Sequence, residues 1–258
     1  MTTASYAPDR VEMVALTGFP LIESGDDLAS LVAATLKSND MTLLDDDVVV
    51  VAQKIVSKSE GRIVTLADVQ PSAEARKRGL ETDKDPALVQ VILDESTAVV
   101  RQHHGVMIVE HRLGFVMANA GVDQSNSHAG QVILLPEDPD ASAARLAAVL
   151  GELSGRRVGV IVSDSIGRAW RNGTVGHAIG VAGIKPLIDL RCTMDLFERP
   201  MQVTEVALAD EIAAAASALM GQGAEAKPVV IVRGFTLAPE DGASVKSLLR
   251  PKDLDLFR

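Results

Sequence analysis

The chain has a single cysteine, Cys192, among its 258 residues. One cysteine can form no intrachain disulfide and cannot supply the several thiolates of a structural zinc site. The first residues lack the basic start and the apolar stretch of a signal peptide. No apolar run reaches the roughly 18 residues that a membrane-spanning helix needs. These absences predict a reduced, soluble, cytoplasmic protein.

Aromatic residues are also scarce, at 3% of the chain, with one tryptophan and one tyrosine. Stacking on aromatic rings is a common basis of single-stranded nucleic-acid binding, so this composition disfavours that function. The formal net charge of −10 disfavours it too, because phosphate backbones repel an acidic surface. An acidic protein that handles nucleotides needs metal ions to mediate the contact. The expected partners are small molecules, without nucleic acid or membrane.

Several common motifs are missing as well. The chain has no G-x-x-x-x-G-K-[ST] phosphate loop, no G-x-S-x-G nucleophile elbow and no H-E-x-x-H zinc motif. Residues 221–226 have the spacing G-x-G-x-x-A, but they follow an expected helix and precede an expected strand, the reverse of the Rossmann order. Two interpretations of these residues stay open: glycine that only ends the helix, or a glycine-rich turn whose backbone amides contact a ligand.

What is present is a series of apolar runs with helical or strand periodicity. Strands are expected at residues 11–16, 48–51, 62–65, 98–102, 106–110, 114–118, 131–135, 158–162 and 228–233. Helices are expected at residues 28–37, 72–78, 86–93, 141–153 and 203–220. Residues 165–200 show no clear periodicity in their first half, which favours a functional loop region. The irregular succession favours an α+β fold, with mixed sheets and flanking helices, in one domain over residues 1–258 that has room for two structural subdomains.

Two segments share one design, in which an apolar strand ends in an aspartate among small polar residues. One segment leads to Asp123 and the other to Asp164. Hard cations such as Mg²⁺ and Mn²⁺ prefer carboxylate, phosphate and water oxygens, and rigid strand ends hold such ligands well. The pair therefore predicts a divalent-metal site. The alternative is that both aspartates only cap turns.

Basic residues accompany these segments. Lys54 and Lys58 follow an expected strand, where ammonium groups can bind triphosphate oxygens; a solvated hairpin is the alternative. Arg168 and Arg171 follow the second aspartate and suit an anionic group of a substrate. Trp170 lies between them and could equally anchor the core.

Taken together, these segments resemble the coenzyme F-420 gamma-glutamyl ligases. The resemblance covers nearly the whole chain, in the right order and spacing, and is carried by residues 18–20, 56–62, 119–126, 163–171, 180–183, 209–211 and 255–258. Where the family often has Gly-x-x-Asp-x-x-Gly, this chain has Cys192 and Glu198 in place of the two glycines. Some relatives carry a fused reductase domain, and none is expected here.

The resemblance implies an enzyme that uses GTP to add L-glutamate to the side-chain carboxylate of the deazaflavin coenzyme F-420-0, in a gamma-glutamyl ligase-like fold that forms an intertwined homodimer. It implies Mg²⁺ or Mn²⁺, with K⁺ as a further candidate. The implied metal ligands are Asp123, Asp164, Ser165 and Gln222. The implied GTP contacts are Phe19, Pro20, Leu21, Ile22, Gln53, Lys58, Asn126, Met220, Gly221, Gln222, Gly223 and Lys227. The expected catalytic residues are Asp123, Asp164, Arg168 and Arg171.

A mechanism follows from charge. A carboxylate reacts with an amine in neutral water only after one of its oxygens becomes a leaving group, and phosphoryl transfer from GTP provides this as an acyl phosphate. Two further hypotheses stay open: a nucleotide- and metal-binding regulator without activity, and a metal-dependent phosphohydrolase. GTP turnover that requires both a deazaflavin acceptor and glutamate would select the ligase.

Overall fold

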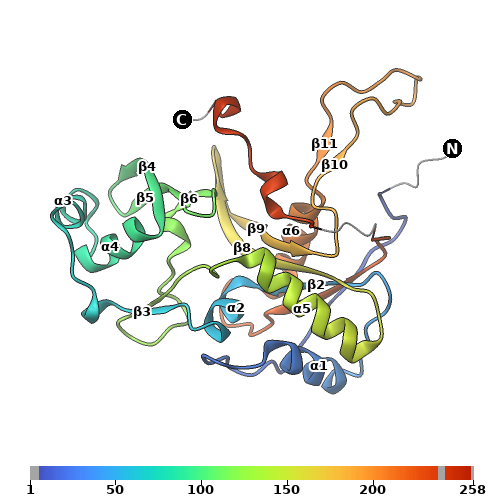
Figure 1. The fold of residues 1–258 in the computed structure, drawn as a ribbon, viewed down its shortest axis with the longest axis horizontal. Coiled ribbons are helices and arrows are strands. Elements are labelled where there is room, and N and C mark those ends of the chain that lie inside the picture. Colours follow the sequence, from blue (N-terminus) through green and yellow to red (C-terminus); the bar gives the residue numbers. More distant parts are fainter. Residues whose placement is uncertain (1–5, 238–241, 257–258) are drawn as a thin grey trace.

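A computed structural model describes residues 6–237 and 242–256 of the chain. Its strands are β1 (Glu12–Ala15), β2 (Val48–Ala52), β3 (Ile63–Thr65), β4 (Ser96–His103), β5 (Val106–His111), β6 (Val116–Ala118), β7 (Gln131–Ile133), β8 (Gly159–Arg168), β9 (Arg171–Ala182), β10 (Ile188–Asp189), β11 (Glu205–Val206) and β12 (Val229–Arg233). Its α-helices are α1 (Leu28–Ser38), α2 (Gln53–Ser59), α3 (Ala73–Thr82), α4 (Pro86–Asp94), α5 (Pro139–Ser154) and α6 (Leu208–Met220). Mixed sheets with flanking helices confirm the α+β prediction (Figure 1). The expected motif at 255–258 extends to Phe257 and Arg258, which lie outside the described residues.

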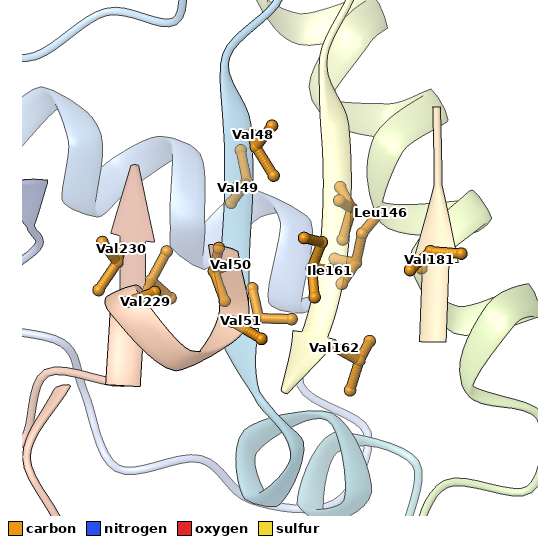
Figure 2. Packing of buried hydrophobic residues seen from close by; sticks show 14 of the residues in the cluster. Val48, Val49, Val50, Val51, Leu146, Ile161, Val162, Val181, Val229 and Val230 are labelled. Atoms are coloured by element: carbon orange, nitrogen blue, oxygen red, sulfur yellow. The ribbon is translucent and has the colours of Figure 1, made fainter. Parts of the chain in front are cut away.

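The main sheet has the strand order β1-β12-β2-β8-β9. Strands β2 and β8 are parallel, whereas the other neighbouring strands in this sheet are antiparallel. The valines of 48–51 are fully buried, as a continuous β-branched run predicts for a central strand. Figure 2 shows them between Val229 on β12 and Ile161 on β8, with Val181 of β9 beyond β8. This sheet carries the larger of two buried apolar clusters, and helices α1, α5 and α6 contribute to that cluster.

A second buried cluster lies under the three-stranded sheet β4-β5-β6 and helix α4. Figure 1 shows these elements, with α3, at the side of the molecule away from β10 and β11. The expectation of one domain with two structural subdomains stays a prediction. No helix in the described ranges is long and apolar enough to cross a membrane.

Capping residues set the helix starts. The side chains of Asp27, Ser72, Asp85 and Asp138 each accept a backbone N–H in the first turn of the helix that follows. Helices α4 and α5 also begin with proline, which has no N–H to leave unpaired there. Local sequence therefore predicts these starts to within one or two residues.

Four predictions about local structure are wrong. The strand expected at 158–162 continues to Arg168, and residues 171–182, expected to lie in a loop region, form its antiparallel partner β9. Residues 53–59 form helix α2 instead of a hairpin. Helix α6 begins at Leu208 and not at 203, because residues 205–206 first pair with β10.

A cluster of charged side chains surrounds Glu95, the residue that follows the last turn of α4. Its Oε2 lies 2.8 Å from Arg62 Nη2, 3.1 Å from Arg112 Nε and 3.3 Å from Nε2 of the fully buried His111. The Nδ1 of His111 accepts the N–H of Leu113, so the proton of a neutral ring sits on Nε2, facing the carboxylate. Burial alone would raise the pKa of Glu95, but the contact with His111 and the two arginines lower it to about 2.

This low pKa predicts how acid weakens the fold. The folded pKa lies below the ordinary value of 4.5, so the stabilisation is complete above about pH 5 and is lost as pH falls toward 2. Glu95→Gln should lower the free energy of unfolding by about 2 kcal/mol at pH 7, and the difference from the parent should vanish near pH 2. Urea unfolding across pH measures it. The control is Glu137→Gln, whose 69% exposed side chain also pairs with Arg112 and should matter by under about 1 kcal/mol. Equal losses would contradict the prediction.

Candidate active site

The candidate site lies where the carboxyl ends of β2 and β8 meet. The two strands are parallel, with Ala52 beside Ser163, so the residues that follow each of them are neighbours. Ligands commonly bind at the carboxyl ends of adjacent parallel strands. Helix α2 begins there with Gln53, and β8 continues there with Asp164.

Asp164 lies inside strand β8, which corrects the expectation that it ends a strand. It follows a bulge at which two adjacent residues of β8, Val162 and Ser163, face Gly180 and Ala178 of β9, with one extra residue between those two. Bulges re-aim the side chains that come after them. Burial and the negative charge of Asp123 raise the pKa of Asp164 to about 6, against the hydrogen bond from the Ser165 N–H and the charges of Lys54 and His177.

Asp123 is held from two directions. Its backbone pairs with Ile133 of β7 in an isolated bridge. Its Oδ2 lies 2.8 Å from Nζ of Lys54 on α2, and its Oδ1 accepts the N–H of Ser125 at 2.6 Å. Burial would raise the pKa of Asp123, but these bonds and the Lys54 charge lower it overall. The site thus sets an ionised carboxylate beside Asp164.

Gln222 reaches the same place from the end of α6. The Oγ of Ser165 donates to its Oε1 at 2.7 Å across 57 positions of sequence. Gly221 ends the helix with a φ of 75°, and the N–H of Gly223 donates to Glu225. The glycines therefore end a helix, and the same turn sets Gln222 against Ser165.

Two further residues expected to contact nucleotide lie on α2. Gln53 is buried, and its amide donates to Ser57 Oγ at 2.6 Å and to the carbonyl of Leu134 at 3.0 Å. Lys58 has no hydrogen-bond or ion-pair partner within 6–237 and 242–256. Burial and the nearby charge of Lys54 lower the pKa of Lys58. An ammonium group next to another ammonium group suits a ligand with several negative charges.

The other expected nucleotide contacts differ in exposure. Phe19 and Ile22 are buried in the main core, so their side chains support the fold, whereas Pro20 is exposed and Leu21 is 91% exposed. Asn126 is exposed with a φ of 57°. Met220 and Lys227 are half-buried at the two ends of the turn after α6.

Arg168 and Arg171 lie further along β8 and β9, where they pair with each other at the turn of the hairpin. Trp170 in this turn is 81% exposed, so the alternative that it anchors the core is wrong. Arg168 is half-buried and Arg171 is exposed. Both arginines lie further along the hairpin than Asp164, and within the described residues no hydrogen bond or ion pair joins them to the two aspartates.

The oxygen atoms of this site fit a hard cation. Asp123 and Asp164 supply two carboxylates close enough for their charges to interact, and Ser165 and Gln222 add a hydroxyl and an amide oxygen 2.7 Å apart. Within the described part of the chain, no three His, Cys, Asp or Glu side chains gather in a metal-binding cluster. Two carboxylates with phosphate oxygens are an ordinary Mg²⁺ environment. All four residues therefore remain candidate ligands.

The pairing of Lys54 with Asp123, and the presence of His177 across from Asp164, are missing from the sequence prediction. His177 Nδ1 lies 3.0 Å from the carbonyl of Val175, and its charge also acts on Asp210, whose pKa is raised by burial. For Lys54, its place directly after a buried strand and Gln53 was an available signal. No signal identified His177, because its position depends on the unforeseen strand β9.

An arm formed around β10 and β11 extends away from the body (Figure 1). Cys192 and Glu198 in this arm have φ values of 66° and 60°, a conformation that favours glycine. These are the two positions at which the resemblance finds glycine in relatives. A residue with a Cβ adopts this left-handed conformation at a cost of about 1 kcal/mol, which applies to Cys192 and to Glu198.

Comparisons with known proteins agree with one another. Residues 18–234 match the family described as F420-0:Gamma-glutamyl ligase. The chain is 46% identical to the coenzyme F420:L-glutamate ligase of Methanothermobacter thermautotrophicus, over 96% of this chain and 99% of that protein. It is 42% and 41% identical to the proteins of that name from Methanocaldococcus jannaschii and Archaeoglobus fulgidus, each over 96% of this chain and 97% of the relative. With this agreement along nearly its full length, the chain belongs to the F420-0:gamma-glutamyl ligase family.

Proposed function

We propose that this chain is a cytoplasmic, GTP- and divalent-metal-dependent ligase that joins L-glutamate to the side-chain carboxylate of coenzyme F420-0, releasing GDP and phosphate. Addition of further gamma-linked glutamates belongs to the same proposal. The names of the relatives support the reaction class. The observation that carries the proposal is the meeting of Lys54, Asp123 and Asp164 beside the ends of β2 and β8.

The reaction needs two displacements. A carboxylate oxygen of the coenzyme attacks the γ-phosphorus of GTP, the bond to the bridging oxygen breaks, and GDP leaves with that electron pair. The α-amine of glutamate then attacks the acyl carbon of the acyl phosphate, phosphate leaves, and the amine loses a proton. Lys54 and Lys58 can bind triphosphate oxygens and offset their charge.

The four candidate ligands, Asp123, Asp164, Ser165 and Gln222, would hold Mg²⁺ or Mn²⁺, which when bound neutralises the triphosphate and aligns the transfer. K⁺ stays a candidate for a further cation. The ionised carboxylate of Asp123 would be one of the cation's oxygen ligands, and Lys54 holds that carboxylate in place through its 2.8 Å contact.

The test is a GTP turnover assay with the coenzyme acceptor and glutamate supplied separately and together. Turnover that requires both supports the ligase. Nucleotide binding without turnover would instead support a regulator, and turnover without acceptor would support a phosphohydrolase.

Lys58→Met should weaken GTP binding about tenfold or more, because it removes a charge at similar volume from a position that suits phosphate. Isothermal titration with GTP and Mg²⁺ measures the change. Lys37→Met is the control, since Lys37 is exposed in the last turn of α1 and should leave the affinity unchanged. Unchanged affinity in Lys58→Met would contradict this placement of the triphosphate.

The proposal includes association of two copies, which the resemblance implies. The β10–β11 arm supports it, because Met194, Phe197 and Val203 are exposed there and Leu196 is 99% exposed. Large apolar side chains gathered on a protruding arm are typical of a surface that a partner covers. Light scattering at micromolar concentration should give the mass of a dimer, and a monomer mass would contradict this part of the proposal.

A further inference from the structure

The turn of the β8–β9 hairpin presents an aromatic ring between two cations. Trp170 is the one tryptophan of the chain and is 81% exposed, although burying so large a ring would favour folding. It has a φ of 57°, which is unusual for a bulky residue. Arg168 and Arg171 flank it, and neither has a carboxylate partner in the ranges that the structure covers. The hairpin turn therefore exposes an indole ring on the same surface as two positively charged side chains.

This surface stands at a fixed separation from the candidate site. Asp164 and Arg168 belong to one strand, which pairs with β9 along its whole length from Val160 to Arg168. At a rise of about 3.3 Å per residue, Arg168 lies roughly 13 Å from Asp164 along the strand, and Trp170 lies beyond it. A ligand that touches both places must be extended.

We propose that the hairpin turn binds the far end of the coenzyme substrate: the deazaflavin ring stacks on Trp170, and Arg168 or Arg171 binds the phosphate in its side chain. This rests on the proposed function, since that substrate carries its ring and its reacting carboxylate at opposite ends of a phosphate-containing chain. A flat conjugated ring stacks on indole regardless of hydrogen-bonding pattern, and guanidinium groups bind phosphate. In the proposed function the triphosphate of GTP is bound near Lys58, away from this turn, so the two arginines are left for the coenzyme.

Trp170 fluorescence provides a direct binding test, because no other tryptophan contributes to the emission. Coenzyme F420-0 added without glutamate should quench the emission and saturate near its KM. GTP alone should not quench it. Free tryptophan amide, titrated in parallel, corrects for light absorbed by the coenzyme. Quenching by GTP would place the guanine at the turn and overturn the proposal, as would a coenzyme titration that matches the free amide.

Substitutions separate this role from the chemistry. Trp170→Asn removes the ring, and asparagine tolerates a left-handed backbone. It should raise the KM for the coenzyme about tenfold, with kcat and the KM for GTP within about threefold of the parent. Trp170→Phe should restore most of the affinity. Leu80→Asn, at an 88% exposed position on α3, is the matched control and should change neither constant.

The outcomes distinguish this inference from the proposed function. A parent protein that ligates glutamate, with an unchanged coenzyme KM in Trp170→Asn, overturns the inference and leaves the proposed function standing. A parent protein that does not ligate removes both. Loss of activity together with a halved mass in light scattering would show instead that Trp170 contacts a second copy, and would also overturn the inference.

Discussion

Replacing Asp164 with asparagine should lower the rate of glutamate ligation by two to three orders of magnitude without destabilising the fold. Under the proposed function, the change removes a charge from a site that would hold cations against a triphosphate, and lost electrostatic contacts of this kind cost about that much in rate. Without metal, the folded chain disfavours ionised Asp164, because its pKa is raised from 3.8 to about 6 by burial and by Asp123. The asparagine variant should therefore be more stable than the parent at pH 7, by on the order of 1 kcal/mol.

The sign can be checked by pH. A raised folded pKa means that stability falls as pH rises from about 4 to above 6, so the advantage of the variant should disappear below pH 4. The measurements are thermal melts in metal-free buffer and a ligation assay across a metal titration. Asp68→Asn is the control for the change in net charge, because Asp68 is exposed and distant in sequence from Asp164. A variant that melts far below the parent would show that Asp164 supports the fold, and normal ligation would mean that the site is placed wrongly.

Gly180→Ala should destabilise the protein by about 3 kcal/mol or prevent it from folding. A Cβ at this position would lie 2.3 Å from the carbonyl oxygen of Pro139 and 2.4 Å from its carbon. The first turn of α5 packs directly on β9 here, and Asp140 of that turn accepts the N–H of Val181 at 2.8 Å. Backbone held this way cannot rotate aside as a side chain can.

Gly167→Ala is the matched control, because the added Cβ on the partner strand β8 meets nothing within 4 Å. Both substitutions reduce the entropy of the unfolded chain equally, so the difference between them isolates the clash. Urea unfolding with circular dichroism gives the two free energies. Similar values for both variants would mean that α5 can move away from the sheet at little cost.

Much of the fold could be predicted because local signals agree with it. The run of valines at 48–51 identifies a central strand, and the cap residues before α1, α3, α4 and α5 set the helix starts. Strand β9 was missed because its glycines resemble loop punctuation. Gly176 and Gly180 are there instead because α6 and α5 approach the strand closely, as the 2.4 Å and 2.3 Å contacts of an added Cβ show. The amino-acid type at one position does not show whether a distant helix packs closely against it.

The site was less predictable than the fold. Apolar runs ending in aspartate suggested Asp123 and Asp164, and their charges do interact, but Asp164 continues a strand after a bulge and does not end one. Lys54 meets Ser125 across 71 positions, a pairing that depends on how β7 and α2 are packed. Which residues bind metal and GTP stays a prediction, since it depends on ligands.

The long sequence separations within the site also bear on how the chain is made. Contacts across 71 and 57 positions close only after the intervening segments have been ordered, and Gln222 leaves the ribosome after every strand of the main sheet except β12. A growing chain therefore lacks one wall of the site until synthesis is nearly complete. A nucleotide bound as proposed here would therefore stabilise only chains that have already brought together the segments carrying Lys54, Asp123, Asp164 and Gln222.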